Sequence, residues 1–167
     1  MITVKATLIG IRPLLMDRMD DATLESLRTG VRKPEPRDVP AEHIARKKIY
    51  TDEAGNVGLP AQMLFACMVV AGRKVKNGKY QISTADSSSL PALLDIEEDF
   101  LVFNGHADKK WEVSKDLGRL QNGTAVCITR PKFLKWGFDV TLEIDESEVS
   151  EETIKQLVAV AGKKFGL

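Results

Sequence analysis

The chain has 167 residues, of which 43% are hydrophobic and 29% are charged, and its 24 basic and 24 acidic side chains cancel. This length and composition predict one globular domain with a hydrophobic core and exclude wholesale disorder. A net charge of zero excludes a molecule that attracts polyanions over its whole surface, so any nucleic-acid surface must be local.

The first forty residues predict a strand and then a departure from the core. Residues 2–12 are rich in β-branched side chains and end before Pro13, a pattern typical of a strand. Residues 17–40 contain a helix-forming stretch from Ala22 to Arg28, closed by Gly30, and then three prolines within residues 31–40. We interpret residues 17–40 as a Pro-rich excursion.

A glycine-rich turn and a proline precede the most hydrophobic segment. Residues 47–60 predict a hairpin with its tip at 53–56, and Pro60 suits the first turn of the helix that follows. The apolar residues of this helix cover more than one face, namely Met63, Leu64, Cys67, Met68, Val70 and Ala71. We therefore expect it to be buried between a sheet and a covering element. The apolar run is shorter than the about 20 residues that span a bilayer.

The second half predicts mainly strands. Residues 80–84 and the segment around 99–104 indicate strands, separated by a serine-rich turn at 87–89, and residues 105–123 indicate a long basic loop. Residues 124–136 and 137–145 predict two strands that form a hairpin with each other. A last helix begins after Ser150, a good N-cap, and ends before Gly166.

The two cysteines and the N-terminal residues indicate a cytoplasmic protein. Cys67 and Cys127 both lie in apolar runs, so we expect both to be buried and reduced rather than joined in a disulfide. The first residues lack the features of a signal peptide, and we expect no membrane partner.

The order of these elements predicts an α+β fold with a single domain over residues 1–167. A ferredoxin-like or RRM-like antiparallel sheet with two core helices and inserted loops fits this order. Three stretches, "GNVGLPAQMLFACMV", "ATLIGIRPLLM" and "VAVAGKKFGL", resemble the RAMP superfamily. The resemblance implies an RNA-binding backbone protein of the kind found in CRISPR effector complexes. We expect the RNA-contacting glycine-rich loop and final strand of that family to be absent from these 167 residues.

The first candidate binding surface is residues 129–138. Cationic and aromatic side chains alternate there, namely Arg130, Lys132, Phe133, Lys135 and Trp136. Bases stack on exposed aromatic rings and phosphates pair with cations, so this mixture suits single-stranded nucleic acid. An ordinary strand pair, with its aromatic residues inside and solvated lysines outside, is the simpler explanation of the same residues.

Two further basic groups are candidates. The loop 105–123 carries Lys109, Lys110, Trp111, Lys115 and Arg119, and Trp111 on such a loop suits a finger that clamps a strand. Alternatively, Trp111 folds back as a packing anchor, while Asp108, Glu112 and Asp116 cancel much of the charge. The other group follows the hydrophobic helix and comprises Arg73, Lys74, Lys76 and Lys79. These cations either stabilise the helix dipole or contact phosphate.

Signals for catalysis are few. Only His43 and His106 are available as histidines, and neither has partners at metal-ligand spacing. We expect no catalytic residue, no metal and no cofactor. The resemblance leaves a metal-independent ribonuclease using His43 or His106 as an alternative. Four acids lie close together in the sequence, namely Asp95, Glu97, Glu98 and Asp99. We expect them to form a solvated turn, and the alternative is a Mg²⁺ site.

The sequence thus predicts a non-catalytic module that binds single-stranded RNA or DNA, as part of a phage, mobile-element or CRISPR-like complex. The alternative is a structural or assembly subunit that forms a homo-oligomer or binds a protein partner, with residues 30–40 reaching a neighbour. The net charge of zero fits this alternative better. The predicted nucleic-acid-binding residues are Arg130, Lys132, Lys135, Trp136, Trp111, Lys109, Lys110 and Arg119.

Overall fold

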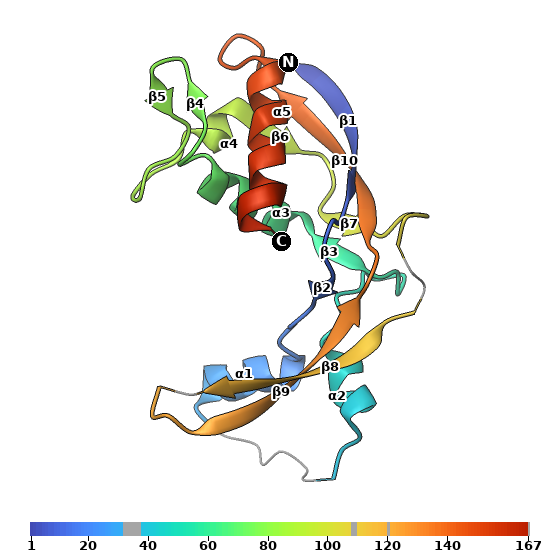
Figure 1. Cartoon of the computed structure of the whole chain (residues 1–167). Helices are drawn as coiled ribbons and strands as arrows, with labels where there is room; N and C mark the ends of the chain where they lie inside the picture. The colour runs from blue at the N-terminus through green and yellow to red at the C-terminus, as the bar shows by residue number, and fades with distance from the viewer. Residues whose placement is uncertain (32–37, 108–109, 120, 167) are drawn as a thin grey trace.

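The computed structural model describes residues 1–31, 38–107, 110–119 and 121–166, and it shows an α+β protein with antiparallel sheets. The chain forms a main lobe and an arm (Figure 1). The main lobe contains β1 (Ile2–Ile9), β3 (Gly58–Pro60), α3 (Ala61–Ala71), β4 (Lys76–Asn77), β5 (Tyr80–Gln81), α4 (Leu90–Leu93), β6 (Leu94–Ile96), β7 (Phe100–Val102), β10 (Gly137–Ile144), α5 (Glu151–Val160) and the π-helix η1 (Ala161–Phe165). The arm contains β2 (Leu14–Leu15), α1 (Asp21–Thr29), α2 (Ala41–Lys47), β8 (Glu112–Arg119) and β9 (Ala125–Phe133).

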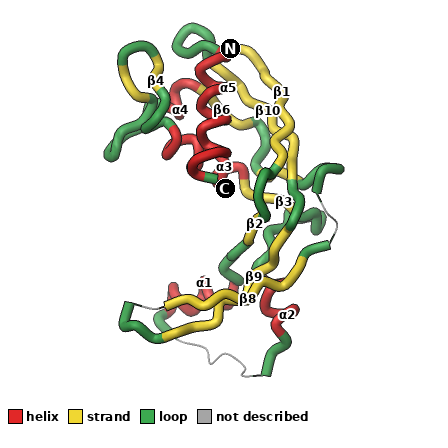
Figure 2. The backbone as a smooth tube through the Cα atoms, in the orientation of Figure 1, coloured by secondary structure: helices red, strands yellow, loops and turns green. Residues whose placement is uncertain are grey.

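The central sheet of the main lobe has the order β1-β10-β6. β1 and β10 pair antiparallel, with Ile2 opposite Ile144 and Ile9 opposite Gly137. Side chains alternate between the two faces of a strand. On β10 every second residue, from Phe138 to Ile144, is therefore buried, whereas Asp139 between them is exposed. The helices of the main lobe lie together on one side of β1 and β10 (Figure 2).

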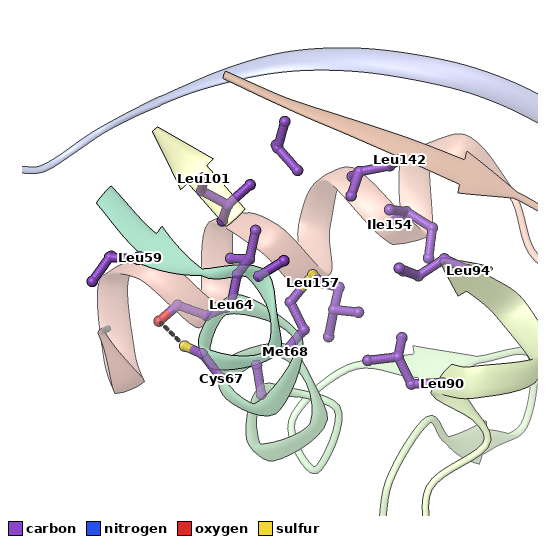
Figure 3. Close-up of a cluster of buried hydrophobic side chains, with 14 of the residues drawn as sticks. Leu59, Leu64, Cys67, Met68, Leu90, Leu94, Leu101, Leu142, Ile154 and Leu157 are labelled. Atoms are coloured by element: carbon purple, nitrogen blue, oxygen red, sulfur yellow. Dashed lines mark hydrogen bonds between the residues drawn. The ribbon is translucent and has the colours of Figure 1, made fainter. Parts of the chain in front are cut away.

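Helix α3 forms the centre of the core and explains why this segment is so hydrophobic. Leu64 and Met68 are buried, and they point into the same cluster as Leu157 of α5 and Leu142 of β10 (Figure 3). The prediction of a helix that begins at Pro60 and is covered on several sides is therefore confirmed. Two of its expected core residues differ, because Met63 is only partly buried and Val70 is 36% exposed.

The C-terminal helix is also confirmed. The hydroxyl of Ser150 accepts a hydrogen bond from the backbone N–H of Thr153 at 3.2 Å, which is the geometry of an N-cap. The helix continues into η1, and Gly166 follows with a φ of +68°. No helix within the described ranges is long and apolar enough to cross a membrane.

The predicted hairpin between residues 124–136 and 137–145 is wrong. Both strands exist as β9 and β10, but β9 pairs with β8 and β2, whereas β10 pairs with β1 and β6. Residues 105–123 are consequently not one long loop, because β8 occupies 112–119. Hydrophobic alternation indicates that a segment is a strand but does not say which strand lies beside it.

Smaller predictions have mixed outcomes. The helix predicted for residues 22–28 is α1, which ends at Gly30 in the left-handed conformation. The turn at residues 53–56 is closed by a single bridge between Thr51 and Val57, and the strand predicted for 80–84 is reduced to β5. Residues 32–37 of the Pro-rich excursion lie outside the described residues.

Candidate nucleic-acid interface

The strands β8 and β9 form an antiparallel ribbon that makes up one side of the arm (Figure 1). They pair along the whole of β8, from Glu112 opposite Lys132 to Arg119 opposite Ala125. Between them Gly123 adopts a φ of +82°, which suits the Asn-Gly turn of a hairpin. We call residues 112–119 and 125–133 the ribbon.

Positive charge accumulates on the ribbon and its flanks. Residues 110–136 include six basic side chains, Lys110, Lys115, Arg119, Arg130, Lys132 and Lys135, and two acidic ones, Glu112 and Asp116. The difference is a net charge of +4 in a chain whose total charge is zero. The stretch that contains the ribbon is thus locally basic in a chain without net charge.

One face of the ribbon presents two cations with an apolar side chain between them. Lys115, Leu117 and Arg119 are alternate residues of β8, so they point to the same face, and all three are exposed. Leu117 is 74% exposed, and Cys127, its partner on β9, is also exposed. The expectation that Cys127 is buried is therefore wrong, because this part of the ribbon has no covering layer.

Leu117 was not among the predicted site residues, because residues 105–123 were interpreted as a loop. Two signals indicate the strand. Val113 and Leu117 stand an even number of residues apart, as on one face of a strand, and an Asn-Gly pair, a strong short signal for a hairpin, follows at 122–123.

Arg130 is engaged inside the arm. Its guanidinium forms an ion pair with Asp116 at 3.0 Å, and its side chain is only 26% exposed. Asp116 also accepts a hydrogen bond from the hydroxyl of Ser114, while Arg130 Nε is buried without a hydrogen-bond partner among the described residues. These contacts indicate that Arg130 stabilises the ribbon. Lys132 is half-buried opposite Glu112, whereas Lys135 is exposed beyond the end of β9.

The two tryptophans have packing partners within the chain. Trp136 donates its indole N–H to the carbonyl oxygen of Arg12 at 2.7 Å and stacks on Phe138, with ring centroids 6.0 Å apart. Trp111 is partly buried, with the guanidinium of Arg46 from α2 5.8 Å from the centre of its ring. α2 also packs against β9 and β8, so Trp111 belongs to the base of the ribbon. Lys110, next to it, is exposed, and Lys109 lies outside the described residues.

The two histidines lie on separate elements. His43 is exposed on α2, and His106 is exposed in the turn after β7, where its backbone N–H donates to Asn104 Oδ1 at 3.0 Å. In the ranges that the structure describes, no three His, Cys, Asp or Glu side chains are arranged to hold a metal ion. The predicted basic and acidic groups at 73–79 and 95–99 both lie on the main lobe, away from the ribbon.

The strongest candidate surface is therefore the exposed face of the ribbon, with Lys115, Leu117 and Arg119 at its centre. Lys110, which precedes β8, and Lys135, which follows β9, are also exposed. No protein-family model matches the chain, and no curated protein shows significant similarity to it.

Proposed function

We propose that the protein is a non-catalytic module that binds single-stranded RNA or DNA, and that the ribbon is its main contact surface. The observation that carries this proposal is the net charge of +4 on residues 110–136 in a chain of zero net charge. Cations that contact phosphates release condensed counterions, which supplies most of the sequence-independent affinity for nucleic acids. A local basic surface therefore suffices for binding, although the whole molecule has no net charge.

The side-chain order on the exposed face suits a single strand. Lys115 and Arg119 are four residues apart on β8, which separates them by about 13 Å along the strand. They can neutralise separate phosphates while Leu117 offers an apolar contact to an unpaired base. Because these contacts do not require particular base edges, we expect binding that tolerates many sequences.

We further propose that the main lobe is a variant of the ferredoxin-like or RRM-like plan suggested by the RAMP resemblance. Its antiparallel sheet, with α3 and α5 packed into the core on one face, supports this assignment. In this arrangement the arm is an insertion that carries the binding surface outside the core. A cytoplasmic location suits such a module.

The test is a titration of labelled single-stranded RNA and DNA at two or more salt concentrations. Four to six phosphate contacts predict a slope of log K against log salt of about −3 to −4. The variant Lys115→Glu/Arg119→Glu should bind at least about tenfold more weakly and with a slope reduced by about 1.4. The matched control Lys163→Glu/Lys164→Glu changes the charge equally at exposed positions on η1 and should bind as the wild type does.

Three results would overturn the proposal. These are no binding at low salt, binding that does not depend on salt, and equal affinities for the ribbon variant and the wild type. The RNA should also be recovered intact. Cleavage that disappears in His43→Ala or His106→Ala would identify a ribonuclease instead.

A further inference from the structure

Two adjoining depressions on the main lobe form a groove with an apolar floor and an acidic rim. One has a volume of about 360 Å³ and is lined by Glu98, Phe100, Val102, Phe103, Asn104 and Asp139. The other has a volume of about 190 Å³ and is lined by Ala61, Gln62, Phe65, Asp95, Ile96, Glu98 and Asp99. They share Glu98, and we call them together the acidic groove.

The carboxylates of the acidic groove form no ion pair within the described part of the chain. Asp139 accepts hydrogen bonds from Thr7 Oγ1 at 2.6 Å and from Asn104 Nδ2, and these bonds lower its pKa. Burial alone would raise the pKa of Glu98, but hydrogen bonds from Thr141 lower it overall. None of the ion pairs among the described residues includes a carboxylate of this groove.

A basic hairpin projects from another part of the same lobe. β4 and β5 pair, with Asn77 opposite Tyr80, and Gly78 turns between them with a φ of +62°. Residues 72–81 contain no acid and four exposed cations, Arg73, Lys74, Lys76 and Lys79. Tyr80 is 80% exposed, although tyrosine is usually at least half covered in a folded protein.

The basic hairpin is held in a defined position. Val75 and Ile82, at its base, are each 1% exposed, and Asn77 Nδ2 donates to the carbonyl oxygen of Glu148 at 2.8 Å. The exposed tyrosine is therefore presented by an anchored element. Tyrosine is enriched at protein–protein contacts, where it often acts as an anchor. Cations beside it add attraction to an acidic partner surface.

The two features cannot meet within one molecule. The hairpin projects beyond the far end of the lobe from β7 (Figure 1), whereas the groove runs along β6, β7 and the start of α3 to Asp139 on the exposed face of β10. A protrusion and a depression of opposite charge on different sides of one chain are complementary between copies.

We infer that the chain associates head to tail, with the basic hairpin of one copy in the acidic groove of the next. Tyr80 would contact the apolar floor formed by Phe100, Val102 and Phe103, and Lys76 and Lys79 would lie near the carboxylates of the rim. Each such contact leaves one free hairpin and one free groove, so copies form a ring or an open chain. This association does not depend on nucleic-acid binding by the ribbon.

Sedimentation of the nuclease-treated full chain over a range of concentrations and salt tests the inference. The wild type should associate with rising concentration, and more weakly at high salt. Tyr80→Ala should weaken association by about 30-fold, the effect of removing an interface anchor. Lys76→Glu/Lys79→Glu and Asp95→Lys/Asp99→Lys should each associate far more weakly than the wild type. The first change lowers the net charge of residues 72–81 from +4 to zero, and the second takes the four carboxylates of the groove from −4 to zero.

Mixing those two variants provides the sharpest result. The first variant keeps the wild-type groove and the second keeps the wild-type hairpin, so the mixture should associate more strongly than either variant does alone. Lys115→Glu/Arg119→Glu, the ribbon variant, should still associate, whereas Lys76→Glu/Lys79→Glu should still bind nucleic acid. Thermal melts establish that each variant is folded.

The inference is overturned if the wild type is monomeric at every concentration, or if folded variants fail to associate when mixed. Loss of association in the ribbon variant would also overturn it, because the ribbon or a bound nucleic acid would then hold the copies together. Failure of these tests leaves the binding titrations of the ribbon unaffected, so the two proposals fail separately.

Discussion

Trp136 donates a hydrogen bond from its indole N–H to the carbonyl oxygen of Arg12 at 2.7 Å, and thereby joins the segment before β10 to the segment after β1. The backbone N–H of Gly10 donates to the carbonyl oxygen of Trp136 at 2.8 Å, and a Cβ at Gly10 would collide with the indole ring. These contacts lie where the arm meets the main lobe.

We predict that Trp136→Phe, which keeps a ring but removes the donor, lowers the free energy of unfolding by about 1 kcal/mol. Urea denaturation measures this, and an unchanged midpoint would show that the hydrogen bond contributes nothing.

Leu64 and Val70 lie on the same helix but differ in burial, at 4% and 36% exposure. We predict that Leu64→Ala lowers the free energy of unfolding by about 2 to 5 kcal/mol, because it leaves a cavity in a packed core. Val70→Ala, the matched control on α3, should cost less than about 1 kcal/mol. Thermal and urea unfolding compare the two. Similar losses in both variants would contradict the burial of one face of α3 and the exposure of the other.

The two cysteines should react with thiol reagents at different rates. Cys127 is exposed on the ribbon, whereas Cys67 is buried, and its thiol donates to the carbonyl oxygen of Gly166 at 2.8 Å. Burial raises the pKa of Cys67, so little of the reactive thiolate is present at neutral pH. A colorimetric thiol assay should show one fast equivalent, lost in Cys127→Ser, and a second that appears only on unfolding. Two fast equivalents in the folded protein would be inconsistent with this packing.

Replacing Asp116 with asparagine should strengthen nucleic-acid binding but lower the stability of the fold. Asp116→Asn removes one negative charge, so the net charge of residues 110–136 rises from +4 to +5 and the affinity for single-stranded nucleic acid should increase several-fold at low salt. The same change breaks the ion pair with Arg130 and should cost about 0.5 to 1 kcal/mol of stability, a modest figure because Asp116 is partly solvated. Asp86→Asn, at an exposed acid away from the ribbon, is the control for both measurements. Weaker binding by Asp116→Asn would show that an intact ribbon matters more than its charge.

Asp139 should contribute to the pH dependence of stability. The hydrogen bond from Thr7, and then that from Asn104, lower its pKa below the ordinary value of 3.8. The pKa of Asp139 is thus lower in the folded state than in the unfolded state, so its ionised carboxylate stabilises the fold above about pH 4. This stabilisation is lost as the pH falls through the folded-state pKa. Thr7→Val should raise the pKa of Asp139 towards 3.8, which an NMR titration of its carboxyl carbon measures. An unchanged pKa in that variant would mean that the threonine bond has no effect on the carboxylate.

Local signals in the sequence were sufficient for several elements. The segment after Pro60 has too many apolar residues for a half-exposed helix, which predicts the buried helix α3. Ser150 followed by acids has the pattern of an N-cap, which predicts the start of α5. The basic residues of the ribbon were also visible, although their location on a strand was not. The exposure of Leu117 and Cys127 was not predictable from local pattern, because apolar residues on an uncovered ribbon look the same as those in a core.

The sequence by itself determined the α+β class, the two main helices and the existence of β9 and β10, because helix caps, proline positions and hydrophobic periodicity act over a few residues. Only the tertiary structure decided that β10 pairs with β1, more than a hundred residues away, and that β9 pairs with β8. Strand pairing depends on which faces can be buried together, and that is a property of the whole chain. The same long-range pairing places Trp136 against Arg12, leaves one face of the ribbon exposed, and puts the basic hairpin and the residues of the acidic groove on different elements of the lobe.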